Sequence, residues 1–330
     1  MNKEGKIEIY RFLACVFIMI AHYVLYMHSE LSIPFTVSFQ FVEFFFIITG
    51  FFTARHVDVK WDENNKLSEL LKYHIKKFMR FLPYTIPAII SVYCLESIDY
   101  IEAGDLTGML INLKDIILEV SFLSVFRKGE AHLFIMWFLS AMFVTLPILM
   151  IFFATRKRII KMVVSLTLPV LYYFFSPDYA LQNTINQLLR AFFGMMLGGG
   201  IYYLSGIIKK KKMPRALQWI GTVIFAVAYI IPIALSYLNT YYKIIYIICF
   251  ALWITMMMSD LTVLKPIHSK VLDFLGEISM SIFIWHIVVF KFVNRIGFLQ
   301  NHLWLQFVSS IIIVLLVSIF NTVITKQCKK

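Results

Sequence analysis

The feature of this chain that most constrains its fold is a series of ten apolar stretches, each long enough to cross a lipid bilayer. A helix needs about 20 apolar residues to cross the roughly 30 Å hydrocarbon core. Because backbone groups in lipid must find their hydrogen bonds within their own segment, each stretch is predicted to be a helix. The predicted spans are residues 8–28, 34–54, 81–98, 132–154, 159–176, 187–207, 217–236, 241–258, 274–293 and 304–325. We therefore predict an all-α membrane protein with a single domain over residues 1–330.

Composition agrees with this fold class. Hydrophobic residues make up 60% of the 330 positions and charged residues 15%, which is typical of a polytopic membrane protein rather than of a soluble domain. The first apolar stretch lacks a small-residue cleavage site, so we predict a retained helix rather than a signal peptide. The four cysteines occur singly, so the sequence predicts neither a disulfide framework nor a metal site.

The distribution of basic residues predicts the orientation. Most of the 31 lysines and arginines fall in the segments that are cytoplasmic if the N-terminus is inside the cell. This excess favours a topology with both termini inside. The same topology explains the net charge of +12, so the expected partner of the basic surface is the lipid bilayer and not nucleic acid.

Two loops between the predicted spans are long. Residues 55–80 are basic, and the sequence LSELLKYHIKKFMR within them has the apolar spacing of an amphipathic helix at the membrane surface. Pro83 suits the start of the third span. Residues 99–131 are predicted to be external, with a surface or partly re-entrant helix within 107–126.

The first apolar stretch contains two ionisable residues, Arg11 and His22, eleven positions apart. At about 100° per residue they share one helix face, roughly 16 Å apart. An ionisable group within the bilayer costs on the order of 2.5 kcal/mol or more unless it faces protein or water, so it marks a candidate functional site. The alternative is a packed, structural His22 with Arg11 extended to the surface as an anchor.

Two further ionisable residues lie at a similar predicted depth. Counted at about 1.5 Å per residue from the inner end of each span, His22 lies roughly 21 Å deep, His286 roughly 18 Å and Glu43 roughly 16 Å. A histidine can accept a proton from a hydroxyl, and a nearby carboxylate would fix its tautomer. The set therefore predicts acid–base chemistry within the membrane. The alternatives are a protonated structural carboxyl at Glu43 and a packed structural imidazole at His286.

Basic and glycine residues elsewhere suggest further roles. Lys76, Lys77 and Arg80 can share a helix surface and present positive charge to an anionic ligand such as the phosphates of coenzyme A; ordinary inside-positive flanking is the alternative. Arg190, near the outer end of the sixth span, could bind a sugar or an anionic carrier, or extend to the membrane surface. Gly198–Gly200 lie inside an apolar helix and predict close helix packing rather than a phosphate loop.

Five short blocks of the sequence occur in an order that is typical of one family. They are Arg11 with His22; FVEFFFIITGFF from Phe41 to Phe52; Lys77 with Arg80, Pro83 and Tyr84; MWFLSAMF from Met136; and GEISMSIFIWH ending at His286. Together they resemble the acyltransferase-3 family of integral membrane acyltransferases, typified by bacterial O-acetyltransferases of surface polysaccharides. The matches extend over nearly the whole chain, and the ordered set is far more specific than any single block.

The chain departs from the family pattern at three points. Glu43 replaces the usual aspartate, which keeps the carboxylate and lengthens its reach. Lys77 replaces an arginine, which keeps the charge but loses the bidentate fork. No extracytoplasmic hydrolase-like domain follows the tenth span, so we expect a stand-alone member.

The resemblance implies transfer of an acyl group from cytoplasmic acyl-CoA, by default acetyl-CoA, to a hydroxyl of an extracytoplasmic or lipid-linked glycan in the bacterial plasma membrane. His22 would be the general base, oriented by Glu43; whether an acyl-histidine forms stays open. The candidate site residues from the residue patterns and the resemblance together are His22, Glu43 and His286 for catalysis, Arg11, Lys76, Lys77 and Arg80 for the donor, and Trp137, Ser140 and Arg190 for the acceptor.

A proton-coupled transporter or polysaccharide exporter is the main alternative function, because ten helices with histidine and glutamate near the midplane also suit a carrier. No matching pair of glycine- or proline-broken helices in the two halves of the chain supports it. The acceptor sugar, the length of the donor acyl chain and the oligomeric state do not follow from the sequence.

Overall fold

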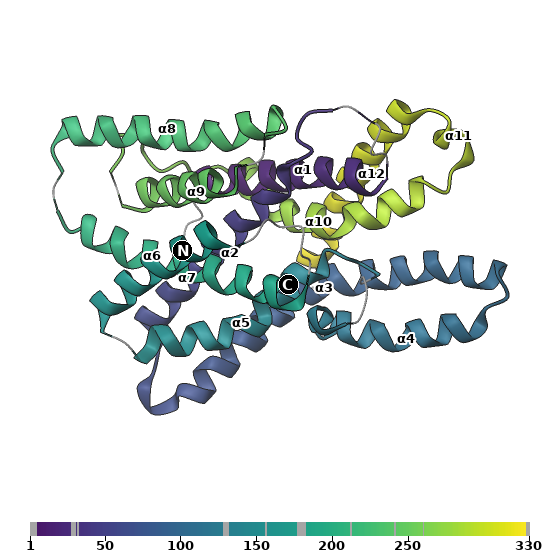
Figure 1. Cartoon of the computed structure of the whole chain (residues 1–330), viewed down its shortest axis with the longest axis horizontal. Helices are drawn as coiled ribbons and strands as arrows, with labels where there is room; N and C mark the ends of the chain where they lie inside the picture. Colours follow the sequence, from purple (N-terminus) through teal and green to yellow (C-terminus); the bar gives the residue numbers. More distant parts are fainter. Residues whose placement is uncertain are drawn as a thin grey trace. The chain divides into compact units, whose positions relative to one another are not determined.

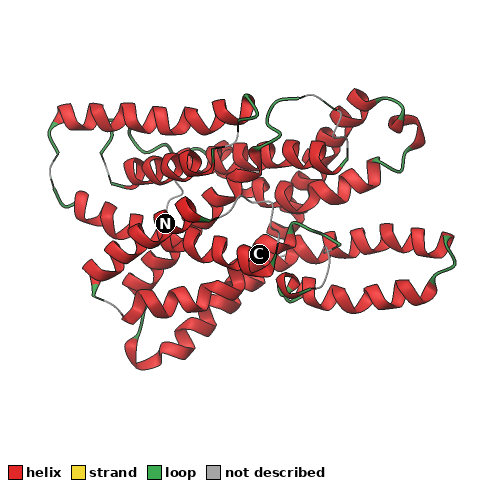
Figure 2. Cartoon of the chain, viewed as in Figure 1, coloured by secondary structure: helices red, strands yellow, loops and turns green. Residues whose placement is uncertain are grey.

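A computed structural model of the chain describes residues 5–27, 31, 33–127, 132–155, 157–176, 183–211, 213–240, 242–259 and 261–327. Within these ranges the regular structure is helical, without a strand (Figure 2). The α-helices, labelled in Figure 1, are α1 (Gly5–Tyr26), α2 (Phe41–Lys60), α3 (Lys66–Glu102), α4 (Leu106–Val120), α5 (Met136–Thr155), α6 (Arg158–Phe175), α7 (Thr184–Ile208), α8 (Arg215–Tyr237), α9 (Lys243–Met258), α10 (Lys270–Val293), α11 (Gly297–Gln300) and α12 (Leu303–Gln327). Short 3-10 turns are η1 (Ser38–Gln40), η2 (Glu63–Asn65) and η3 (Ser124–Phe126).

Each predicted span corresponds to an observed helix. Among the described residues, eight helices are long and apolar enough to cross a membrane: α1, α3, α5, α6, α7, α8, α10 and α12. The other two are α2, which carries charged residues at both ends, and α9, which is apolar but has only 16 residues. The all-α polytopic membrane fold is thus confirmed, while the count of ten crossings and the orientation of the termini stay predictions.

Helix α3 differs from the prediction. The sequence suggested a surface helix that ends before a separate span at residue 81, whereas the structure has one helix of 37 residues, Lys66–Glu102. Pro83, expected at a helix start, lies inside it together with Pro87. Proline removes one backbone donor and commonly kinks a helix but need not end it in a membrane, where neighbouring groups satisfy the freed carbonyl. The basic stretch and the third span therefore form one element.

The predicted surface helix within residues 107–126 is present as α4. The Asp105 carboxylate caps its N-terminus by accepting from the Gly108 N–H at 2.8 Å. α4 lies beside the second half of α3 (Figure 1), and the Tyr93 hydroxyl donates to the Met109 carbonyl at 3.1 Å. The two helices thus form an antiparallel pair joined by a short turn.

The chain divides into two compact units. The first, called unit 1, comprises Met1–Phe39, Lys76–Ser140 and Pro266–Lys330; the second, called unit 2, comprises Gln40–Ile75 and Ala141–Lys265. One boundary falls within α3 and another within α5. In unit 1, α10 packs against α1 and α12, and about half of its residues are buried.

Unit 2 is built on the close contact of α2 with α7. A Cβ atom at Gly198 would lie 1.9 Å from the Ile47 carbonyl oxygen, and one at Gly50 would lie 1.8 Å from that of Met195. A Cβ atom at Gly199 would meet the Phe153 ring at 2.2 Å. The prediction that Gly198–Gly200 mediate close helix packing is confirmed, because only glycine leaves room for the neighbouring backbone and ring.

Candidate active site

Two histidines lie in direct contact inside unit 1. His22 comes from the last turns of α1 and His286 from the buried middle of α10. The His22 Nδ1 atom lies 2.8 Å from the His286 Nε2 atom, and the rings stack with centroids 5.1 Å apart at an interplanar angle of 13°. Both side chains are buried. The structure thus brings together two imidazoles that the sequence placed only at a similar depth.

The hydrogen-bond chain assigns the protons of this pair. The His286 Nδ1 atom lies 3.0 Å from the Ile282 carbonyl oxygen, one turn earlier in α10. A carbonyl only accepts, so this Nδ1 carries the hydrogen, and in the neutral ring Nε2 is an acceptor. His22 must then donate from Nδ1, which leaves the lone pair of His22 on Nε2. That nitrogen can act as a base or a nucleophile.

Aromatic rings surround the histidine pair. The Phe134 ring meets His22 edge-on, with centroids 5.0 Å apart, and Phe290 meets His286 in the same way at 5.6 Å. Apolar walls keep bulk water away and favour the neutral form of both rings, because an isolated charge is costly to bury. A neutral, oriented imidazole is the state that proton transfer from a hydroxyl requires.

The residues expected to bind the donor lie on α1 and α3 of unit 1. The Arg11 Nη1 atom forms an ion pair with the Glu8 Oε2 atom at 3.0 Å. Lys76 and Arg80 are exposed on α3 and Lys77 is half-buried. Arg80 of α3 and Arg11 of α1 both act electrostatically on the Tyr84 hydroxyl.

Helix α5 contributes the two residues expected at the acceptor side of unit 1. Ser140 is fully buried, and its Oγ atom accepts a hydrogen bond from the Val125 N–H at 2.9 Å. Trp137 is half-buried. This hydrogen bond links η3 to α5, so the Ser140 hydroxyl has a structural role. The acceptor roles of both residues stay predictions.

Glu43 and Arg190 form a buried cluster in unit 2. The Glu43 Oε1 atom accepts from the Arg190 Nε atom at 2.8 Å, and Oε2 accepts from the Tyr173 hydroxyl at 2.5 Å. Glu43 is fully buried, and both of its carboxylate oxygens accept a hydrogen bond. Both residues thus have partners in unit 2. Their predicted roles, Glu43 in orienting His22 and Arg190 in binding a sugar, stay predictions.

Comparison with known proteins identifies the family. A family model described as an acyltransferase domain, Acyl_transf_3, matches residues 4–323. The chain belongs to the acyltransferase-3 family. No curated protein and no solved structure matches the chain. The family and the apolar helices together make the protein a membrane acyltransferase.

This acyltransferase has a second histidine cluster in unit 1 that the sequence did not predict. His132, just before α5, contacts the Glu96 carboxylate of α3 through Nδ1, and Glu96 also pairs with Lys291 of α10. One available signal was the position of Glu96 and Lys291 near the ends of predicted apolar spans, where ionisable groups are expensive unless they are paired. Nothing in the sequence pattern pointed to His132 as their partner.

A buried carboxylate supports this second cluster from α4. The Glu119 Oε1 and Oε2 atoms accept from the backbone N–H groups of His132 at 2.6 Å and Leu133 at 3.3 Å. Burial is the largest influence on Glu119 and raises the pKa of its carboxyl, while those N–H groups and the Arg127 charge act in the opposite direction. The buried Glu119 carboxylate therefore fixes the backbone at His132.

Proposed function

We propose that this membrane acyltransferase transfers an acyl group, acetyl by default, from cytoplasmic acyl-CoA to a hydroxyl of an extracytoplasmic or lipid-linked glycan. The observation that carries the proposal is the hydrogen-bond chain from Ile282 through His286 to His22, which places the lone pair of His22 on Nε2, among aromatic rings. The family supplies the reaction class.

In the proposed reaction His22 Nε2 accepts the proton of the acceptor hydroxyl. The hydroxyl oxygen attacks the carbonyl carbon of the thioester, the carbon–sulfur bond breaks, and coenzyme A leaves as the thiolate, which takes up the proton from His22 and restores the base. The positive charge on His22 is shared with His286 through the hydrogen bond between the two rings. General-base catalysis of this kind contributes about 10²–10⁴-fold. Attack by the same lone pair on the thioester, giving an acyl-histidine, is the two-step variant.

The basic residues of unit 1 support the choice of donor. Four basic residues, Arg11, Lys76, Lys77 and Arg80, lie on α1 and α3, and the charges of Arg11 and Arg80 both act on the Tyr84 hydroxyl. Guanidinium and ammonium groups bind the phosphates of coenzyme A by charge-assisted hydrogen bonds. In this proposal these groups hold the donor while its thioester reaches the histidine pair.

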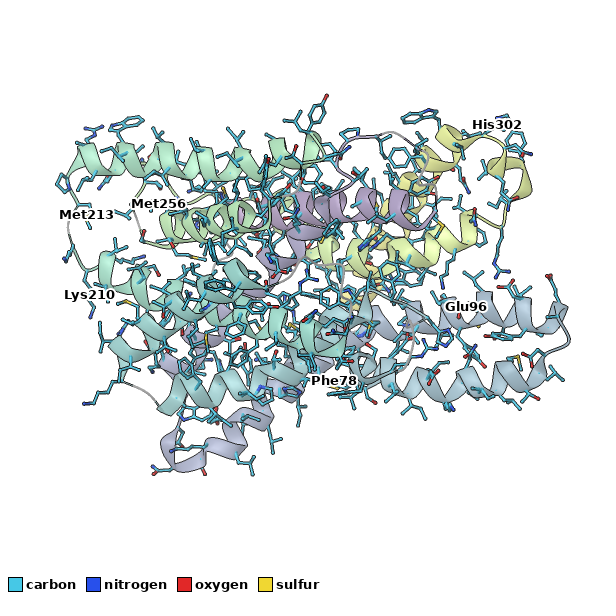
Figure 3. All side chains as sticks on the ribbon, viewed as in Figure 1. Phe78, Glu96, Lys210, Met213, Met256 and His302 are labelled. Atoms are coloured by element: carbon cyan, nitrogen blue, oxygen red, sulfur yellow. The ribbon has the colours of Figure 1, made fainter. Side chains whose placement is uncertain are left out.

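The test uses sealed membrane vesicles that contain the full-length protein and acetyl-CoA labelled in the acetyl group. We expect label to appear covalently on envelope glycan, and His22→Ala to reduce the rate about 100-fold or more because the base is lost. His302→Ala is the matched control, since His302 is an exposed histidine of the same unit, labelled in Figure 3.

Two results would contradict the proposal. Near-normal transfer by His22→Ala would remove the mechanism, whatever the rate of Glu43→Gln. Uptake of unmodified solute without covalent label would instead support the transporter alternative.

A further inference from the structure

His132 is fixed on three sides by different helices of unit 1. Its ring Nδ1 contacts the Glu96 carboxylate of α3. Its backbone N–H donates to the Glu119 Oε1 atom of α4 at 2.6 Å, and its carbonyl oxygen accepts from the Lys291 Nζ atom of α10 at 3.1 Å. Three helices thus hold one residue in a single orientation, which is how proteins place a group that must meet a ligand.

The other ring nitrogen of His132, Nε2, makes none of these contacts. A carboxylate accepts, so the contact with Glu96 places a hydrogen on His132 Nδ1, and in the neutral ring Nε2 then carries the lone pair. His132 is only 6% exposed, and its Nε2 atom is buried without a hydrogen-bond partner in the part of the chain that the structure describes. A buried acceptor without a donor is unfavourable, so its retention calls for an explanation.

The charges around His132 indicate what kind of ligand would satisfy it. Each neighbouring basic side chain already has a carboxylate: Lys291 has Glu96, Arg295 has Asp99 at 2.6 Å, and Arg127 has Asp115 at 3.0 Å. Glu119 adds a further carboxylate beside His132, so no excess positive charge is left for an anion such as the phosphates of coenzyme A. A lone pair in such surroundings matches a neutral hydroxyl donor.

The cluster also lies at the end of unit 1 that is opposite the basic stretch. On α3, Glu96 follows Arg80 by sixteen residues, roughly 24 Å along a helix; Figure 3 labels Glu96. It is nevertheless close to the histidine pair, because Phe134, two residues after His132, has its ring against His22. The Tyr93 ring meets His132 edge-on at 6.2 Å, and aromatic rings suit the apolar faces of sugars.

We propose that His132 is an acceptor-binding residue, whose Nε2 accepts a hydrogen bond from a hydroxyl of the glycan and holds the sugar beside His22. Glu96 is its positioning residue, because it fixes the tautomer. The inference rests on the proposed function and adds to it the subsite that receives the polyhydroxylated acceptor. No bond is made or broken at His132.

The test measures steady-state transfer by the full-length protein in proteoliposomes. The concentration of labelled acetyl-CoA and that of total envelope glycan from the producing cells are varied in turn. The glycan concentration is expressed as sugar content. His132→Asn keeps an amide N–H for Glu96 but lacks the Nε2 atom, and His132→Ala lacks both. We expect both variants to raise the apparent KM for glycan about tenfold or more with the KM for acetyl-CoA within twofold of wild type. His302→Ala should leave both constants unchanged.

The outcomes separate this inference from the function on which it rests. If the wild-type protein transfers no label to glycan, the proposed function fails and the inference fails with it. If the wild type is active and His132→Asn keeps the wild-type KM for glycan, only the inference is overturned. An equal rise in both KM values in a folded His132→Asn protein would assign His132 a structural role and would also overturn it.

Discussion

A buried carboxylate with two donors determines the local stability of unit 2 at the residue scale. Glu43 accepts from Arg190 and Tyr173, which come from α7 and α6. Removing one partner from such a cluster leaves the carboxylate less well satisfied in a site that water does not reach. The residue pair Glu43 and Arg190 was visible in the sequence as two ionisable groups within apolar spans, whereas Tyr173 carried no signal in a chain so rich in tyrosine.

We predict that Tyr173→Phe lowers the stability of the protein by about 1.5–3 kcal/mol, the usual value of a hydrogen bond to a charged group. The measurement is the midpoint of thermal unfolding in detergent. Tyr172→Phe is the matched control, because it keeps the stacking of that ring on Phe193 and leaves the Glu43 contacts intact. Equal midpoints for the two variants would show that the Tyr173 hydroxyl contributes nothing.

At the scale of the elements, α2 and α7 pack backbone against backbone. Glycine at positions 50 and 198 lets each backbone approach the other, so the distance between the helices is set by the absence of side chains. In lipid no hydrophobic force drives helices together, and such close van der Waals contact is what stabilises their association.

We predict that Gly198→Ala destabilises the protein by at least about 2 kcal/mol, because the added methyl group would meet the backbone of Ile47 and Phe51, which cannot move without separating the helices. Gly297→Ala is the control, since nothing lies within 4 Å of a Cβ atom there. Detergent melting of the two variants gives the comparison. A Gly198→Ala protein as stable as Gly297→Ala would refute the packing argument.

For the whole molecule, the arrangement in the membrane is the property to test. The basic segments predict that both termini are inside, with ten crossings. The turn between α3 and α4 and the segment between α7 and α8 should then lie on opposite sides of the membrane. Two exposed residues mark these places: Glu102, the last residue of α3, and Lys210, which follows α7 and is labelled in Figure 3.

We predict opposite accessibility for single cysteines placed at these two positions in a protein whose four native cysteines are replaced. A membrane-impermeant thiol reagent should label a cysteine at Glu102 in intact cells, and label one at Lys210 only after the membrane is opened. Labelling of both positions from the same side would contradict the predicted alternation of the helices.

The sequence by itself determined the helices, because a bilayer requires apolar segments of fixed length with internally satisfied backbones. It also marked Arg11, His22, Glu43 and His286 as costly ionisable groups. Tertiary structure decided which of them meet: His22 with His286, and Glu43 with Arg190 and Tyr173. It also joined residues 66–102 into one helix and assembled His132, Glu96 and Lys291. Depth along a helix follows from counting residues, but the partner of a side chain depends on which helices are neighbours and how each is rotated, and an apolar pattern does not encode those two quantities.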